Sequence, residues 1–413
     1  MKIRLMQLID YWVGVPLCCL LSVYQRVNLL FRPAAIKPTK KILFIELSEM
    51  GSAVIAYSAL ANAVCQYGRE NIYFLIFKIN SESVEILNVL PKKNILTIDS
   101  RNFFAFVFSS WRMLLKVRSL AIDTVIDMEL FSRFTMLFSY MSGAGKRIGF
   151  DNYTAEGLYR GKLLTHPVFY NHHQHMQINF IALFQAAVNY QNSQPQIKEN
   201  VLSSLIDLPL FVPPAETASA ALDLLKASGV GRQALLEKKV IIFNPDPGTA
   251  LPIRGWPAES YTQLAKMILQ QWPDYYLVVV GLKGAQKYYQ ALASELNAKA
   301  IIDLTGRTNT LADLLAVVNN AALIVGNDSG PAHFASLIKV DSLVLFGPET
   351  PNLYRPLGDK VRIFYAGLCC SPCLSAANHR HTICKNNKCL QAIGAAEVFA
   401  VIKECIEKRE NKH

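Results

Sequence analysis

The stretch "ALIVGNDSGPAHFAS" (322–336) reads as an apolar strand, a short polar loop and the start of a helix. Ser329 and Gly330 would leave free backbone N–H groups at the helix start, and Pro331 suits the first helical position. Such a terminus binds phosphate through its N–H groups and its dipole. Phosphate would repel Asp328, so we expect this carboxylate to hold sugar hydroxyls or to shape the loop.

A second loop in the same half of the chain carries matching chemistry. "NPDPGTALPIRGWPAESY" (244–261) follows an apolar strand and places Arg254 and Trp256 just before a helix that starts with proline. The planar guanidinium of Arg254 suits a bidentate contact with a diphosphate. His333 of the first loop lies within reach of a pyrophosphate or a sugar. The alternative for the first loop is a plain capped helix with a buried histidine.

Outward from these loops, β-rich runs alternate with helical patterns, which predicts parallel, doubly wound sheets. The rhythm breaks in the polar and proline-rich region around 191–215 and then restarts, so we expect two Rossmann-like α/β domains. The expected strands are 41–47, 71–77, 94–99, 121–128, a run within 143–150, 238–248, 275–281, 300–306, 322–328 and 341–347. The expected divisions are an N-terminal segment (1–38), a first domain (39–200), a linker region (201–236) and a second domain (237–413).

The N-terminal segment has a composition of its own. Residues 1–41 hold seven Lys/Arg and one Asp, which is more than half of the net charge of +11, so the basic balance does not indicate nucleic acid. The apolar run 11–24 has aromatic residues at both ends, and Gly14 and Pro16 interrupt it. These features favour an interfacial segment beside anionic lipid. The alternatives are a signal peptide, which Asp10 disfavours, and a helix docked on its own domain.

With these loops in place, the sequence resembles glycosyltransferase family 9, the lipopolysaccharide heptosyltransferases. The run from Thr305 to Pro356 carries the family's "NDSGP" and "LFGPxxPxxxxP" patterns, and "RGWP" (254–257) is also similar. The first-half stretch 123–150 and the cysteine pattern near the end resemble the family too. The resemblance covers roughly 40–405.

The resemblance implies a GT-B fold in which two Rossmann-like domains face a central cleft. The first domain would bind a lipid-linked saccharide acceptor, and the second a nucleotide sugar, most often ADP-heptose. The implied reaction inverts the anomeric carbon without a metal, on the cytoplasmic face of a bacterial inner membrane. The donor contacts carried over are Asn244, Arg254, Trp256, Asn327, Asp328, Ser329, Gly330 and His333.

The catalytic loop departs from the family pattern. In "FIELSEMGSAVIAYSAL" (44–60), Ser52 stands where the family has the Asp taken as the base. A serine hydroxyl is no general base without an activator, so we expect Glu49, then Glu46, to replace it. The alternative is that Glu49 only caps the following helix. Arg133 is the expected acceptor contact, although a solvated surface charge is the simpler interpretation.

Five cysteines crowd into 369–389. The spacing Cys370-x2-Cys373-x10-Cys384-x4-Cys389 suits a structural zinc site, with reduced thiols packing a loop as the alternative. No cofactor is otherwise expected.

Two rival functions remain open at this stage. Ser52 favours an inactive homologue that binds a nucleotide sugar or a glycan. A Rossmann oxidoreductase is the second rival, but no GxGxxG follows the first strand of either domain.

Overall fold

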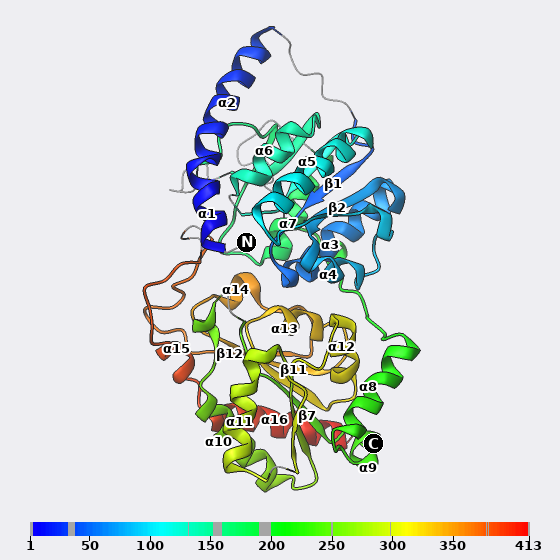
Figure 1. Ribbon diagram of the computed structural model, residues 1–413, viewed down its shortest axis with the longest axis vertical. Helices are drawn as coiled ribbons and strands as arrows, with labels where there is room; N and C mark the ends of the chain where they lie inside the picture. Colours follow the sequence, from blue (N-terminus) through cyan, green and yellow to red (C-terminus); the bar gives the residue numbers. More distant parts are fainter. Residues whose placement is uncertain are drawn as a thin grey trace. The chain divides into compact units, whose positions relative to one another are not determined.

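The computed structural model describes residues 3–31, 38–130, 132–151, 159–189, 200–248, 251–297, 299–376, 378 and 380–411. The chain divides into two compact units, unit 1 (Met1–Asp207) and unit 2 (Leu208–His413). Each unit has its own sheet, core and helices, and each is described by itself (Figure 1).

The described part of unit 1 holds a six-stranded parallel sheet in the order β3-β2-β1-β4-β5-β6. All four residues of the central strand β1 are buried, because helices cover both faces of the sheet. The strands are β1 (Ile42–Ile45), β2 (Ile72–Phe77), β3 (Ile95–Ile98), β4 (Thr124–Asp127), β5 (Lys146–Asp151) and β6 (His166–Phe169).

Helices cover the two faces of this sheet differently. On one face, α3 and α7 pack against each other. On the other face, α5 and α6 bury apolar side chains against Leu43 and Ile45 of β1. The helices of unit 1 are α1 (Ile3–Trp12), α2 (Gly14–Phe31), α3 (Met50–Tyr67), α4 (Glu82–Glu85), α5 (Phe103–Ser119), α6 (Arg133–Met141) and α7 (Met176–Val188).

The N-terminal helices α1 and α2 pack on α6 of the same unit (Figure 1). Cys18 of α2 is fully buried beside Met136 and Leu163, whereas most of the other large apolar residues of α2 are exposed. The helical run breaks at Val13, between the end of α1 and Gly14, which begins α2, while Pro16 lies within the first turn of α2. The helical stretch Met6–Phe31 is long enough and apolar enough to cross a membrane, judged by length and composition alone. Residues 1–2 and 32–37 of the predicted segment lie outside the described residues.

The described part of unit 2 repeats this design with the sheet order β12-β11-β10-β7-β8-β9. Its strands are β7 (Val240–Asn244), β8 (Tyr276–Val279), β9 (Ile301–Asp303), β10 (Leu323–Asn327), β11 (Asp341–Phe346) and β12 (Val361–Tyr365). Its helices are α8 (Ala215–Ala227), α9 (Arg232–Leu236), α10 (Ala258–Gln271), α11 (Gln286–Glu295), α12 (Leu311–Asn319), α13 (Gly330–Ala335), α14 (Pro351–Tyr354), α15 (Lys388–Gln391) and α16 (Ala395–Glu410).

The two parallel sheets agree with the predicted α/β class, and every predicted strand is present. The sequence analysis missed two edge strands, β6 and β12. Strand β6 is only four residues long and contains Pro167, which an edge strand tolerates. The predicted linker (201–236) differs from the structure, in which the chain belongs to unit 2 from Leu208 onward. Within this stretch, α8 packs on α12 and its Leu225 is buried.

Candidate active site

Each sheet has one point where the strand order reverses, and ligands of doubly wound folds bind beside such points at the carboxyl ends of the strands. In unit 1 this switch point lies between β1 and β4, where Ile45 pairs with Asp127. In unit 2 it lies between β7 and β10, where Asn244 pairs with Gly326. The predicted base loop follows β1, and the predicted donor loops follow β7 and β10.

The loop between β1 and α3 is held by Glu129, which follows β4. One oxygen of its carboxylate accepts hydrogen bonds from Leu47 N at 2.8 Å, Ser48 N at 3.1 Å and Ser48 Oγ at 3.1 Å. Burial raises the pKa of Glu129, and these hydrogen bonds act in the opposite direction by stabilising the carboxylate. Glu129 therefore fixes the backbone of the loop. The sequence analysis gave this residue no role.

The same loop is held from its other side by Asn80. The side-chain Nδ2 of Asn80 donates to Leu47 O at 3.2 Å and to Ser48 O at 3.0 Å. Asn80 ends the short 3-10 turn Lys78–Asn80 after β2. Both neighbouring strands thus contribute a side chain that fixes Leu47 and Ser48, just before the predicted base.

Glu49 occupies the N-cap position of α3, but its side chain makes no capping hydrogen bond. Instead, its Oε2 accepts a hydrogen bond from Ser52 Oγ at 3.3 Å. Glu49 is partly exposed, whereas the Glu46 side chain is buried at the end of β1. A base must reach a substrate hydroxyl, so this placement favours Glu49 over Glu46 and gives Ser52 an orienting role.

Arg133 requires a correction. Its side chain is only 2% exposed and forms an ion pair with Asp10 of α1, with Nη1 lying 3.1 Å from Oδ2. The other Asp10 oxygen accepts from Arg133 N at 3.0 Å and Phe134 N at 2.9 Å, so Asp10 binds the first turn of α6. Arg133 Nε donates to Tyr159 O at 2.8 Å. Arg133 thus docks the N-terminal helix and is not placed to contact an acceptor.

Arg254 and Asp328 meet at the switch point of unit 2. Arg254 Nη1 donates to Asp328 Oδ2 at 3.1 Å, and both side chains are largely buried. Burial raises the pKa of Asp328, while the Arg254 guanidinium acts in the opposite direction. Arg254 Nε has no hydrogen-bond partner among the described residues. The guanidinium therefore keeps an unused donor beside its ion pair.

Asn327 and Trp256 hold this pair in place and do not face a ligand. Asn327 is fully buried; its Oδ1 accepts from Trp256 N at 2.9 Å, and its Nδ2 donates to Pro245 O at 2.5 Å. The Trp256 ring is fully buried, donates from Nε1 to Ile393 O and packs edge-on against Tyr261. Their predicted role as donor contacts is therefore replaced by positioning of the Arg254 segment.

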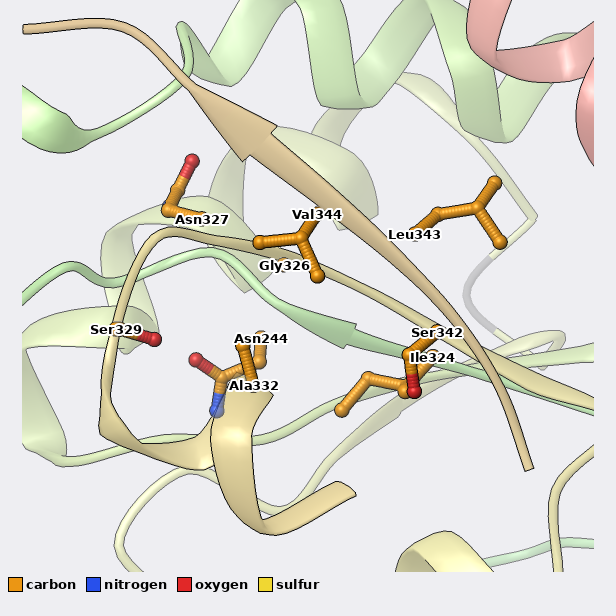
Figure 2. Close-up of a pocket in the computed structure, with 9 residues that line it drawn as sticks. All are labelled: Asn244, Ile324, Gly326, Asn327, Ser329, Ala332, Ser342, Leu343 and Val344. Carbon is orange, nitrogen blue, oxygen red and sulfur yellow. The ribbon is translucent and has the colours of Figure 1, made fainter. Parts of the chain in front are cut away.

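The predicted phosphate loop leads into α13, which is only six residues long. Ser329 is its N-cap residue and makes no side-chain capping bond, Gly330 begins the helix, and the His333 side chain is buried. Figure 2 shows Ser329 and Asn244 pointing toward each other beside α13, where they line a small void. Asn244 Nδ2 has no hydrogen-bond partner among the described residues.

Glu349 is a buried carboxylate that the sequence analysis did not single out. It follows β11 and is 2% exposed, and Arg380 Nε lies 3.4 Å from its Oε2. Burial and the nearby Asp328 carboxylate raise the pKa of Glu349 to about 8, against the opposing effect of Arg254. A charged residue directly after a buried strand, inside the "FGPETP" run, was the available signal.

The structure does not gather the cysteines into a metal centre. Among the described residues, no three His, Cys, Asp or Glu side chains form a group that would hold a metal ion. Cys389 is buried, and the Cys373 sulfur accepts a hydrogen bond from Thr382 Oγ1 at 3.4 Å. Cys370 and Cys384 are exposed, and both the predicted zinc and its alternative, reduced thiols packing a loop, stay predictions.

Comparison with known proteins gives a consistent picture of the family. The family profile described as glycosyltransferase family 9 (heptosyltransferase) matches residues 110–383, which is more than half of the chain. Lipooligosaccharide heptosyltransferase 2 of Haemophilus influenzae is 29% identical over 175 residues. That match covers 40% of this chain and 48% of the relative, so the chain spans about half the length of this relative.

Two solved structures show the fold. The E. coli ADP-heptose LPS heptosyltransferase II matches 90% of this chain and 99% of its own, with a TM-score of 0.67 and 18% identity. The E. coli heptosyltransferase WaaC, solved with ADP, matches 88% of this chain and 99% of its own, with a TM-score of 0.60 and 14% identity. These similarities, with the two doubly wound sheets, confirm the predicted GT-B fold class.

Proposed function

Because this chain belongs to glycosyltransferase family 9, we propose that it is an inverting, metal-independent glycosyltransferase. Its donor is a nucleotide sugar, most simply ADP-heptose, and its acceptor is a lipopolysaccharide core or a related glycolipid. The observation that carries the proposal is the Arg254–Asp328 pair at the switch point of unit 2. A cation and a carboxylate side by side match the two halves of a nucleotide sugar.

The choice of ADP-heptose rests on the relatives. The H. influenzae relative is a heptosyltransferase by name, and the similar E. coli heptosyltransferase WaaC was solved with ADP. The Arg254–Asp328 pair at the switch point favours a diphosphate donor but does not distinguish one nucleobase or sugar from another. The nucleobase and the sugar of the donor are therefore the parts of the proposal that a binding experiment tests first.

Arg254 stabilises the leaving group in this mechanism. As the bond between the anomeric carbon and the diphosphate oxygen breaks, negative charge grows on that oxygen, and a fixed guanidinium is well suited to stabilise it. The Arg254 side chain is 18% exposed, so the guanidinium can bind phosphate while Nη1 keeps Asp328. Asp328 and Asn244 then lie where sugar hydroxyls or phosphate oxygens would be recognised.

Glu49 is the proposed general base. It removes the proton from an acceptor hydroxyl, whose oxygen then forms the new bond to the anomeric carbon from the side opposite the diphosphate. The proton ends on the Glu49 carboxylate, and the nucleoside diphosphate leaves with the bonding electrons. Ser52, 3.3 Å from Glu49 Oε2, orients the carboxylate, while Glu129 and Asn80 fix the loop that carries it.

The proposed place of action is the cytoplasmic face of a bacterial inner membrane. A lipid-linked acceptor lies in a bilayer, and the apolar helices α1 and α2 with their basic flanks suit attachment to that surface. A metal in the cysteine loop would have a structural role only, which metal analysis of the purified protein tests.

Calorimetric titration of the detergent-purified full chain tests the donor site directly. We expect ADP to bind selectively over UDP, GDP and NAD, and Arg254→Ala to weaken ADP binding by about ten- to a hundredfold, as loss of a charge-assisted contact does. Arg362→Ala, an exposed arginine on β12, is the matched control and should bind normally. Selective binding of UDP or GDP would keep the transferase but overturn the heptose donor.

An inactive homologue is the second candidate, because Ser52 stands in place of the usual base. A transfer assay with radiolabelled ADP-heptose and deacylated core acceptor separates the two. Transfer above the background of a boiled sample supports the enzyme. ADP binding without transfer to any core acceptor would support the binding protein, and NAD binding alone would point to the oxidoreductase.

A further inference from the structure

Helix α5 of unit 1 presents an apolar stripe to solvent. Its inward side chains, Leu114 and Val117, are buried in the core. Its outward side chains recur at helical spacing and are exposed, with Phe104 at 82%, Phe108 at 70% and Trp111 at 61%. A helix that is apolar on both faces has more apolar surface than its own domain buries.

The charges around this stripe have one sign. Arg112, Lys116 and Arg118 are exposed on α5, and the helix contains no acidic residue. Aromatic rings with flanking Lys and Arg are typical of protein segments at the membrane–water interface. A protein partner would need an apolar, acidic surface, whereas an anionic bilayer offers both features at once.

The N-terminal helices lie on the same face of the sheet as α5. Met6 of α1, Phe106 of α5 and Phe134 of α6 all pack against one core cluster, and the rings of Phe106 and Phe134 are 4.8 Å apart. Helix α2 packs on α6 (Figure 1). On α1 and α2 the exposed large apolar side chains are Leu8, Tyr11, Trp12, Leu17, Leu20, Val23, Tyr24, Val27, Leu29, Leu30 and Phe31.

We propose that α1, α2 and α5 form one lipid-binding surface through which unit 1 lies on an anionic bilayer. The sequence suggested a lipid contact for the N-terminal segment only, and the structure adds α5 as an independent part of the surface. The buried Cys18 and the Asp10–Arg133 ion pair keep α1 and α2 on unit 1. This docking favours helices that lie in the interface over a helix that spans the bilayer.

The proposal extends the membrane attachment suggested for the N-terminus but is tested through substitutions in α5, in chains that all keep α1 and α2. Its failure therefore leaves the donor chemistry untouched, and failure of the donor chemistry leaves this surface untouched.

Tryptophan quenching locates the contact. In the full chain carrying Trp12→Phe, three tryptophans remain: Trp111 is exposed, Trp256 is fully buried and Trp272 of unit 2 is partly buried. Vesicles of phosphatidylethanolamine and phosphatidylglycerol with brominated acyl chains should quench part of the emission, because Trp111 reaches the acyl boundary. The added substitution Trp111→Phe should abolish that quenching. Quenching that survives Trp111→Phe would overturn the proposal.

Sedimentation with vesicles of the same headgroups measures the energetic share of α5. The full chain with Phe104→Ser, Phe108→Ser and Trp111→Ser should partition at least about tenfold less, since binding scales with buried apolar area. Val212→Ser with Leu236→Ser, two exposed apolar residues of unit 2, is the matched control and should partition normally. Equal partitioning of the two variants would contradict the proposal.

The basic residues are tested separately. Arg112→Gln with Lys116→Gln should weaken binding to phosphatidylglycerol vesicles by about fivefold per charge at low salt and leave binding to pure phosphatidylcholine unchanged. Light scattering without lipid identifies the rival occupant. If the three serine substitutions convert a dimer to a monomer and leave vesicle binding intact, α5 binds a second copy and the lipid proposal is wrong.

Discussion

The two units of this protein share one strand order but use their switch points differently. In unit 1, residues after neighbouring strands hold the backbone of the β1–α3 loop, with Glu129 and Asn80 binding Leu47 and Ser48. Glu49 is left partly exposed beside Ser52. In unit 2, the side chains themselves pair, with Arg254 on Asp328. One switch point presents a carboxylate, and the other a cation that already has a partner.

This difference teaches how one topology provides two chemistries. A base needs access to a substrate proton, so unit 1 fixes the loop through its main chain and leaves Glu49 partly exposed. A diphosphate site needs a preorganised cation, so unit 2 buries one and balances its charge with Asp328. The donor must then share Arg254 with a carboxylate, which predicts that donor binding depends on charge balance in unit 2.

The largest expected effect comes from removing the Glu49 carboxylate at the switch point of unit 1. We expect Glu49→Gln to lower kcat by about 10²–10⁴, the usual share of a general base, with ADP binding unchanged. Glu70→Gln, an exposed acid that pairs with Lys93, is the control and should retain full activity. Unchanged transfer by Glu49→Gln would remove this residue from the mechanism and direct attention to Glu46.

In unit 2, the pH dependence of the free energy of unfolding tests the buried carboxylate Glu349. The pKa of Glu349 is raised from 4.5 to about 8, so the folded state binds the proton more tightly than the unfolded state. This contribution to stability is fully present below about pH 4.5, declines as pH rises and is lost above about pH 8, a total on the order of 5 kcal/mol. Denaturant unfolding across this range measures it.

The matched variant for that titration is Glu349→Gln. It should equal the wild type near pH 5 and be more stable near pH 8.5, because the glutamine carries no buried charge. Asp127, whose pKa burial raises to about 6, contributes a slope of the same sign that both proteins share. Identical pH slopes in the two proteins would show that Glu349 titrates normally.

The hydrogen bonds between Glu129 and the β1–α3 loop of unit 1 give the next largest effect. We expect Glu129→Gln to lower kcat by about ten- to a hundredfold, because a misplaced loop moves the base out of position. ADP binding in unit 2 should not change. Steady-state kinetics combined with calorimetry separate these outcomes, and equal losses in kcat and ADP affinity would indicate general unfolding instead.

The smallest expected effect concerns Ser52. Ser52→Ala removes one hydrogen bond to Glu49, which is worth about 0.5–1.5 kcal/mol or a two- to tenfold fall in kcat. A loss as large as that of Glu49→Gln would mean that Ser52 itself takes part in proton transfer. Single-turnover kinetics make the comparison, since product release then does not mask the chemical step.

Much of the fold was predictable from the sequence because parallel strands buried on both faces read as short apolar runs between helical patterns. Strand β1 is buried at every position and was easy to place. Strand β12 lies at the edge of its sheet and has only one buried residue, Phe364, so it lacked that signal. The helices α8 and α9 followed a proline-rich stretch and were attributed to a linker.

The sequence predicted which loops form the candidate site, but not the role of each side chain within them. Arg254 and Asp328 were both expected near the donor, and the structure pairs them. Trp256 and Arg133 looked equally suited to ligand binding, yet Trp256 lies in the core and Arg133 binds Asp10. Burial and ion pairing depend on residues more than 70 positions away, which local patterns do not encode. Glu129 was missed for the same reason.

The Asp10–Arg133 ion pair also matters for anyone who prepares this protein. Trimming an apolar N-terminus is a common route to better solubility, but here it would remove the carboxylate that pairs with Arg133 and binds the first turn of α6. It would also uncover Met136 and Leu163, which pack beside Cys18. Apolar surface that loses its cover costs roughly 25 cal/mol per Å² exposed, and the net stability of a typical domain is only about 5–15 kcal/mol. An inactive truncated sample would therefore report on a damaged scaffold and not on the catalytic loop.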